Sequence, residues 1–312
     1  MSSKVATIGF FDGVHRGHQY LCQQLKQLAG ADGSTLVLTF NEHPQRVLGR
    51  PDAPKLLTTN AEKSYFLECV CGIDDVVFLD FTAEMAHLTA REFMEQYLRD
   101  RYGVTHLLIG YDHHFGRPQC DAEGQRLPEG FEDYQRYGRD LGIEVVLAKE
   151  LPSDQRVSSS AVRRLIADGD VEGANALLGY TYRINGTVVS GHQVGRTIGF
   201  PTVNLRPVSD EMLLPAPGVY VTMARVFGRD FPAVTNIGHR PTLNNGPELS
   251  VESHFLGVEK LPPFADCPIS VDLHARLREE QRFDSIEALK EQIARDIEAA
   301  TTWHREHVQN VY

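Results

Sequence analysis

Two histidines three residues apart, His15 and His18, stand in a glycine-rich segment at residues 9–18. The segment lies where a first predicted strand ends and a first helix begins, the position at which open α/β sheets bind nucleotides. Gly9 and Gly17 let backbone amides approach an anion, the helix N-terminus adds a favourable dipole, and imidazoles donate hydrogen bonds to phosphate oxygens. The spacing therefore indicates a phosphate site, with a nucleotide α-phosphate as its natural guest.

Simpler roles for the two histidines remain open at this point. One histidine could be a helix cap and the other an ordinary surface residue, and a single H-x-x-H spacing does not exclude this interpretation. Zinc binding is a further alternative, but zinc ligands on a helix prefer a spacing of four, and no third ligand is obvious nearby.

A second glycine-rich segment lies at residues 186–204, where Gly195 and Gly199 precede Thr202 and Asn204. A glycine loop beside two oxygen-bearing side chains suits ATP phosphates and Mg²⁺. Ordinary turns are the competing interpretation, because Gly and Pro cluster in turns and Thr and Asn often bond the local backbone.

Both segments need a scaffold, and the first half of the chain predicts a parallel α/β sheet. Short β-branched runs alternate with helical patterns, at residues 5–10, 35–40, 75–79, 105–110 and 144–147. Thr59 with Glu62 and Thr89 with Glu92 have the spacing of capping boxes, so helices are expected to begin near residues 60 and 90.

The second half has a different texture, with runs at 182–190, 218–226, 249–256 and 269–277 punctuated by Gly and Pro. This pattern predicts a small antiparallel β-barrel. Asp284 with Glu287 resembles a helix cap, and an apolar stripe from Ile286 to Ile297 predicts a closing helix packed on the barrel. The change of pattern divides the chain into domains at 1–182 and 183–312.

Composition narrows the classes of partner. The formal charge of -11 in 312 residues argues against a nucleic-acid partner, which normally needs clustered Lys and Arg. No apolar run is long enough to span a bilayer, so no membrane partner is expected. The five scattered cysteines favour free thiols in a reducing cytoplasm.

Residues 8–18 resemble the flavin adenylyltransferase form of the H-x-G-H nucleotidyltransferase signature. Later blocks agree: T-F-N-E-H-P at 39–44, L-T-T with E-K at 57–63, G-Y-D-H-H-F-G at 110–116 and V-S-S-S-A-V-R at 157–163. The resemblance implies that Ser159, Ser160 and Arg163 contact ATP phosphates, and that Asp112 and Phe115 bind the flavin. The family often has Asn where Phe10 stands and Phe where His113 stands.

Residues 195–204 are similar to the riboflavin kinase loop G-R-x-x-G-F-P-T-x-N, and further blocks follow in order to residue 283. The resemblance implies that Gly195 and Gly199 belong to the phosphate loop, that Thr202 and Asn204 bind Mg²⁺–ATP, and that Glu252 is the catalytic base. A solvent-facing glutamate on a strand is the alternative for Glu252. Residues 255–258 depart from the family pattern, so the flavin-side loop is expected to differ.

Together the resemblances imply a bifunctional riboflavin kinase/FAD synthetase. Riboflavin and ATP would give FMN and ADP in the second domain, and FMN and ATP would give FAD and pyrophosphate in the first, with Mg²⁺ in both. Two alternatives stay open. One is a nucleotidyltransferase for another metabolite, and the other is a flavin-binding or regulatory protein that has lost turnover at one site.

Overall fold

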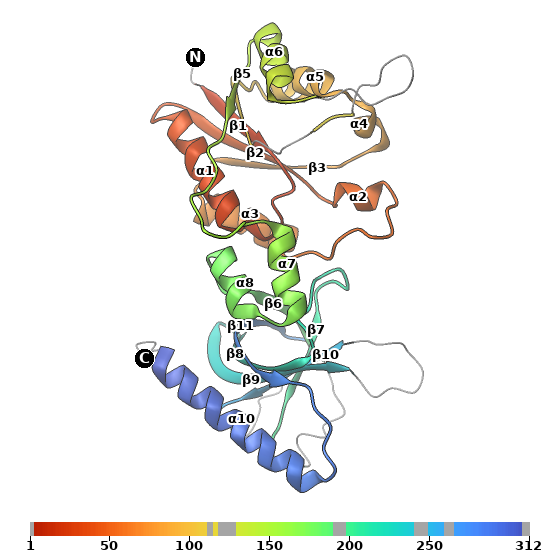
Figure 1. Cartoon of the computed structure of the whole chain (residues 1–312), viewed down its shortest axis with the longest axis vertical. Helices are drawn as coiled ribbons and strands as arrows, with labels where there is room; N and C mark the ends of the chain where they lie inside the picture. The colour runs from red at the N-terminus through yellow and green to blue at the C-terminus, as the bar shows by residue number, and fades with distance from the viewer. Residues whose placement is uncertain are drawn as a thin grey trace. The chain divides into compact units, whose positions relative to one another are not determined.

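The computed structural model describes residues 3–110, 115–117, 129–189, 198–239, 249–258 and 265–307. The chain forms two compact units, Met1–Val157 and Ser158–Tyr312, whose elements are labelled in Figure 1. Within the described ranges, no helix has the length and apolar character needed to span a bilayer.

The first unit is built on a five-stranded parallel sheet with the order β3-β2-β1-β4-β5. Its strands are β1 (Lys4–Ile8), β2 (Ser34–Phe40), β3 (Asp75–Leu79), β4 (His106–Ile109) and β5 (Glu144–Leu147). The predicted parallel sheet is confirmed. The first strand ends at Ile8 rather than at residue 10, because the backbone turns out of the sheet to form the loop that precedes the first long helix.

Helices connect these strands. They are η1 (Asp12–Val14), α1 (Arg16–Ala29), α2 (Pro44–Val47), α3 (Asn60–Tyr65), η2 (Phe66–Val70), α4 (Ala83–His87), α5 (Ala90–Phe93), η3 (Met94–Arg101) and α6 (Phe131–Leu141). Both expected capping boxes are confirmed: Thr59 and Glu62 bond each other's backbone amides at the start of α3, as Thr89 and Glu92 do in α5. Each box satisfies two amides that a helix start leaves without intrahelical partners.

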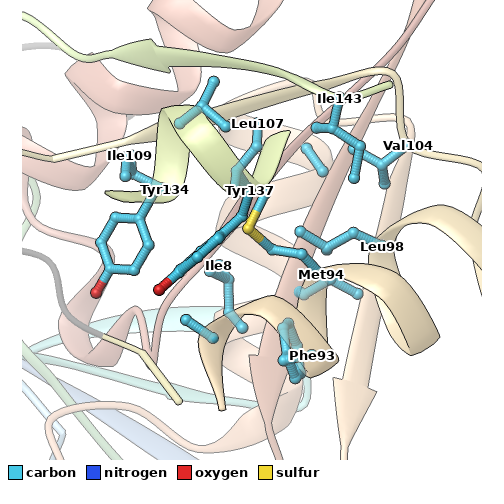
Figure 2. Close-up of a cluster of buried hydrophobic side chains, with 14 of the residues drawn as sticks. Ile8, Phe93, Met94, Leu98, Val104, Leu107, Ile109, Tyr134, Tyr137 and Ile143 are labelled. Atoms are coloured by element: carbon cyan, nitrogen blue, oxygen red, sulfur yellow. The ribbon is translucent and has the colours of Figure 1, made fainter. Parts of the chain in front are cut away.

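Both faces of the sheet are buried. Alternate residues of each strand point to opposite faces, and a cluster of apolar side chains covers each face. Ala6 of β1 packs in a cluster that α6 and the α5–η3 segment cover, whereas Val5 packs in a second cluster with Leu25 of α1. Figure 2 shows Tyr134 and Tyr137 of α6 within the first cluster, together with Phe93, Met94 and Leu98. The sheet is therefore a rigid base for the loops at its edges.

The second unit begins with α7 (Ser159–Asp168) and α8 (Val171–Leu178) and continues into a closed barrel. The ring order is β10-β7-β6-β11-β8-β9, and every neighbouring pair is antiparallel. The strands are β6 (Arg183–Val189), β7 (Val203–Pro207), β8 (Gly218–Val226), β9 (Arg229–His239), β10 (Leu249–Phe255) and β11 (Pro268–Glu279). The predicted barrel is confirmed.

Helices α7 and α8 are joined to the barrel by hydrogen bonds. Asn175 of α8 donates from Nδ2 to the carbonyl of Leu273 on β11 (2.9 Å) and accepts from the amide of Tyr182 (2.7 Å). The amide of Ala216 donates to the carbonyl of Ile166 in α7 (3.2 Å). By contacts these helices belong to the second unit, and the functional division at 182/183 stays a prediction.

The last helix, α10 (Ile286–His307), packs on the outer face of the barrel over β8, β9 and β11. Its Ala300 packs with Val221 and Val234, and the buried carboxylate of Asp296 forms an ion pair with the partly buried Arg278 of β11 at 2.9 Å. The predicted helix is confirmed, but the apolar stripe does not extend to its first turn, because Ile286 is 57% exposed. The expected cap is also wrong: Oγ of Ser285, not Asp284, accepts the hydrogen bond from the amide of Ala288.

The barrel interior contains a row of buried hydroxyl groups. Oγ1 of Thr235 is 2.7 Å from Oγ1 of Thr222 and 2.8 Å from Oγ of Ser253, so the row joins β8, β9 and β10. All three side chains are fully buried. Because each hydroxyl bonds another, the interior satisfies these polar groups without charge.

Candidate functional site

The loop after β1 is held in an unusual conformation. Phe11 (φ 54°) and Val14 (φ 32°) lie in the left-handed region, which is rare for a bulky or β-branched residue. The buried carboxylate of Asp12 accepts hydrogen bonds from the amides of Leu57 and Thr58 and from the Thr58 hydroxyl, at 3.0–3.2 Å. These hydrogen bonds compensate for the backbone strain of the loop that connects β1 to α1.

His15 and His18 are brought together at the start of α1. The His15 side chain caps the helix, accepting at Nδ1 from the amide of His18 (3.4 Å), and the two rings stack with centroids 3.7 Å apart. We assign the proton of neutral His15 to Nε2, since Nδ1 accepts. Gly17 leaves room for this arrangement, because a Cβ there would lie only 3.2 Å from the His15 ring. The cap and the stacked pair thus coexist.

Burial makes His18 a neutral imidazole at neutral pH. Burial lowers the pKa of His18 well below 6.5, and the charges of His15 and Lys63 lower it further. The His18 residue is half-buried, and its Nδ1 is buried and has no hydrogen-bond partner among the described residues. At neutral pH His18 therefore offers a phosphate one N–H donor rather than a full charge.

Lys63 of α3 is a site residue that the sequence did not single out, although it stands in the E-K block at 62–63. Its side chain is 1% exposed, and Nζ lies 3.9 Å from the centroid of the Phe10 ring and 3.4 Å from the carbonyl of Phe40. Burial lowers the pKa of Lys63 to about 8. Asp12 and Lys63 bring opposite charges beneath the loop that carries His15 and His18.

The serine run at 158–160 and Arg163 lie at the start of α7, in the second unit. Ser158 is the N-cap, and its hydroxyl accepts from the amide of Ala161 (3.2 Å). Ser159 and Ser160 are the first two residues of the helix and are therefore not its cap. Whether these residues join His15 and His18 around one nucleotide stays a prediction.

Of the two residues of the first unit that were expected to bind the flavin, the structure describes only Phe115. Asp112 lies outside the described residues, as does His113. Phe115 stacks on Tyr134 (centroids 4.8 Å apart) and packs edge-on against Phe93, so its ring lies at the border of the first cluster. Its role toward a flavin stays a prediction.

In the second unit, the ladder of β10 aligns three polar residues on one face of the barrel. Glu252 of β10 is opposite Asn204 of β7 on one side and opposite Asn236 of β9 on the other. Directly paired residues of adjacent antiparallel strands point to the same face, about 4.5–5.5 Å apart at Cβ. Val251 and Ser253 point into the barrel, so this row lies on the outer face, with Asn204 buried and Glu252 partly exposed.

The segment before β7 is tied to the same face. Nδ1 of His254, two residues after Glu252 on β10, lies 2.9 Å from the carbonyl of Pro201, and Phe200 packs against the His254 ring. This places Thr202 immediately after the residue whose carbonyl joins the segment before β7 to β10. His254 is thus a positioning residue that the sequence did not single out. Gly199 takes a φ of 92° in the turn before it, and Gly195 lies outside the described residues.

Two family models match successive parts of the chain. The family model described as FAD synthetase matches residues 1–161, and the model described as riboflavin kinase matches residues 178–304. The first range contains the His15–His18 site, and the second contains the row of Asn204, Glu252 and Asn236.

Curated relatives match along nearly the whole chain. Proteins named bifunctional riboflavin kinase/FMN adenylyltransferase are 34% identical in Listeria monocytogenes and 37% identical in Pseudomonas fluorescens, covering 94% and 95% of this chain and 90% and 91% of the relatives. A crystal structure from Streptococcus pneumoniae, described as a macrolide-efflux protein, has a TM-score of 0.84 and 30% identity over 97% of this chain and 95% of its own. The two family models and the curated relatives agree, and the chain belongs to the family of bifunctional riboflavin kinase/FMN adenylyltransferases.

Proposed function

We propose that this chain phosphorylates riboflavin with ATP to give FMN and ADP, and then transfers AMP from a second ATP to FMN to give FAD and pyrophosphate. The observation that carries the proposal is the match of one chain to both family models, in order, over the two parts that contain the candidate sites.

Glu252 is proposed as the general base of the kinase reaction. The nucleophile is the terminal hydroxyl of the ribityl chain, which holds its proton tightly at neutral pH. As its oxygen attacks the γ-phosphorus of ATP, the proton passes to the Glu252 carboxylate, the bond from the γ-phosphorus to the bridging oxygen breaks, and ADP leaves. The placement of Glu252 on the outer face of the barrel, between two asparagines, supports this role.

Thr202 and Asn204 are proposed to hold the Mg²⁺ of Mg²⁺–ATP. The side chains present fit such an ion: a hydroxyl and an amide carbonyl are hard oxygen ligands, and Mg²⁺ commonly takes few protein ligands beside phosphates and waters. The described residues contain no group of three or more His, Cys, Asp or Glu that could hold a metal. Because Thr202 and Asn204 are both neutral, the phosphates of ATP would balance the positive charge of the ion. When bound, the ion neutralises phosphate charge, and Gly195 and Gly199 are proposed to line the phosphate loop.

The adenylyl transfer needs no protein base. A phosphate monoester such as FMN has a second pKa of about 6 and is already nucleophilic at pH 7. Its oxygen attacks the α-phosphorus of ATP, the α–β anhydride bond breaks, and pyrophosphate leaves with the electron pair. The site has to align the reactants and stabilise charge, which we assign to the first-unit residues His15, His18, Gly9 and Gly17.

Other contacts of the adenylyl site are proposed from the family pattern. Ser159, Ser160 and Arg163 would bind ATP phosphates, and Asp112 and Phe115 would bind the flavin. The substrates are small molecules rather than nucleic acid or membrane, in keeping with the charge of -11. The odd, scattered cysteines support a reducing cytoplasm as the location.

The proposal is tested by separating the flavins formed from riboflavin, ATP and Mg²⁺ by chromatography over time. FMN should appear first and FAD later, with ADP and pyrophosphate as coproducts. Supplying FMN in place of riboflavin should give FAD directly. Binding of riboflavin without turnover would support a flavin-binding protein instead, and adenylylation of another phosphate ester in preference to FMN would support a different nucleotidyltransferase.

A further inference from the structure

Lys63 is a buried cation at the edge of the sheet where α/β proteins bind their ligands. Lysine is almost never fully buried without a partner, yet this side chain is 1% exposed. Its ammonium lies against the carbonyl of Phe40, the last residue of β2, and over the ring of Phe10, which follows β1. The charge is therefore positioned at the carboxyl ends of two neighbouring strands, below the loop to His15.

The position of Lys63 is set by its own helix. The capping box of Thr59 and Glu62 fixes the first turn of α3, and Lys63 is the next residue after Glu62. The Glu62 carboxylate is bound to the amide and hydroxyl of Thr59, both at 2.7 Å, and so is engaged on the capping side.

The charge of Lys63 is poorly matched by the protein around it. An ammonium has three donors, and among the described residues its one hydrogen-bond acceptor is the Phe40 carbonyl, at 3.4 Å. The Asp12 carboxylate attracts it through space, but that carboxylate already accepts from Leu57 and Thr58. A buried charge costs much free energy unless an opposite charge compensates for it, and an anionic ligand would supply the missing compensation.

The other basic groups facing this position do not supply a comparable charge. His18 is neutral at pH 7, because burial and its neighbours lower its pKa. His15 uses Nδ1 as a helix cap, and His43 packs edge-on against the Phe10 ring, with centroids 4.6 Å apart. Lys63 has a pKa of about 8, so it is largely protonated at pH 7, and beside these three described imidazoles it supplies a full positive charge beneath the loop.

We propose that the Lys63 ammonium is a fixed positive charge beneath the loop of the adenylyl site and attracts the phosphate groups of FMN and ATP to this edge of the sheet. The inference rests on the proposed adenylyl transfer. Negative charge moves toward the departing pyrophosphate as the phosphate oxygen of FMN attacks the α-phosphorus, and a preorganised cation in a site of low dielectric stabilises that redistribution. Lys63 acts through its field across the Phe10 ring, as an electrostatic positioning residue.

Three variants test the charge itself. Lys63→Met removes the charge with little loss of volume, Lys63→Arg keeps it, and Lys26→Met removes an exposed lysine of α1 as the matched control. For adenylylation of FMN, we expect Lys63→Met to lower kcat/KM about 10- to 100-fold, Lys63→Arg to recover most of the loss, and Lys26→Met to match the parent. Riboflavin phosphorylation by the same samples should be unchanged in all three.

The pH profile supplies a readout that a purely structural role would not produce. The parent kcat/KM for FMN should fall above about pH 8, as Lys63 loses its proton, and Lys63→Arg should not show this fall, because a guanidinium stays charged. The thermal midpoint of Lys63→Met should equal or exceed that of the parent, since an uncompensated buried charge has been removed. A profile that is identical in parent and Lys63→Arg overturns the proposal even where Lys63→Met folds poorly.

Failure of this inference is distinguishable from failure of the proposed function. A parent protein that makes no FAD from FMN refutes the adenylyl transfer itself. A parent that makes FAD, with Lys63→Met equally active across the pH range, refutes only the role of Lys63.

Discussion

Replacing Glu252 by glutamine isolates the one proton transfer that the two reactions do not share. Glu252 is paired in the middle of β10, between Asn204 and Asn236, so its backbone position is fixed by ladders on both sides. Its side chain is partly exposed and forms no ion pair with the described residues. Glutamine keeps the size and most of the polarity, and we expect a change in folding free energy within about 0.5 kcal/mol.

The expected effect on catalysis is much larger. A positioned general base contributes about 10²- to 10⁴-fold to a rate, which corresponds to about 2.7–5.4 kcal/mol in the activation barrier. Riboflavin phosphorylation should fall by that factor. FAD formation from supplied FMN should stay at the parent rate, because its nucleophile is an ionised phosphate. The expected increase in the activation barrier is much larger than the expected change in folding free energy, so the assay can separate the two effects.

The assay measures both reactions on one sample, beside a thermal unfolding curve. Glu298→Gln, an exposed change on α10, is the matched control and should leave both rates unaltered. Loss of both activities would indicate misfolding. Phosphorylation of riboflavin at the parent rate by Glu252→Gln, in a folded sample, would refute the assignment of the base, and the proton would have to leave by another route.

Three further outcomes concern the second unit. A fragment that begins at Ser158 should retain kinase activity and unfold at a higher temperature than one that begins at Arg183, because α7 and α8 bond the barrel; equal midpoints would contradict this. Asp296→Ala should destabilise this fragment by about 1–3 kcal/mol in denaturant titration, since it leaves the partly buried Arg278 guanidinium without its carboxylate partner, whereas the exposed Glu298→Ala should change little. Burial lowers the pKa of His304, so the unfolded state takes up its proton first, and stability should fall as pH drops below about 6.5; His304→Gln should flatten this dependence of the thermal midpoint.

The architecture could be predicted from local patterns because its elements are locally specified. The β-branched runs of the first half and the capping boxes at Thr59 and Thr89 act within a few residues, and each agrees with the fold. At the start of α10 the local signal was ambiguous: Asp284 and Ser285 are both good caps, and the hydroxyl of Ser285 makes the bond.

The sites were predicted less completely, because their support comes from distant parts of the chain. The spacing of His15 and His18 predicts a phosphate site, but the hydrogen bonds that hold their loop join Asp12 to Leu57 and Thr58, about 45 residues later. Nothing in the composition of α3 indicates that Lys63 is buried, since lysine is normally an exposed residue. Such long-range contacts depend on which strands pair and which loops and helices then lie side by side. Local periodicity does not specify that arrangement.

The closed ring of the second unit has a consequence for how each half of the chain opens. In the parallel sheet, β3 and β5 each pair on one side only, so either can detach by breaking a single ladder. In the ring every strand pairs on both sides, and releasing any one of them breaks two ladders. Amide hydrogens of the edge strands can then exchange through local fraying, whereas those of the ring exchange through a larger, cooperative opening. Among the strands that the structure describes, only β3 and β5 therefore have an edge open to β-pairing with a second chain.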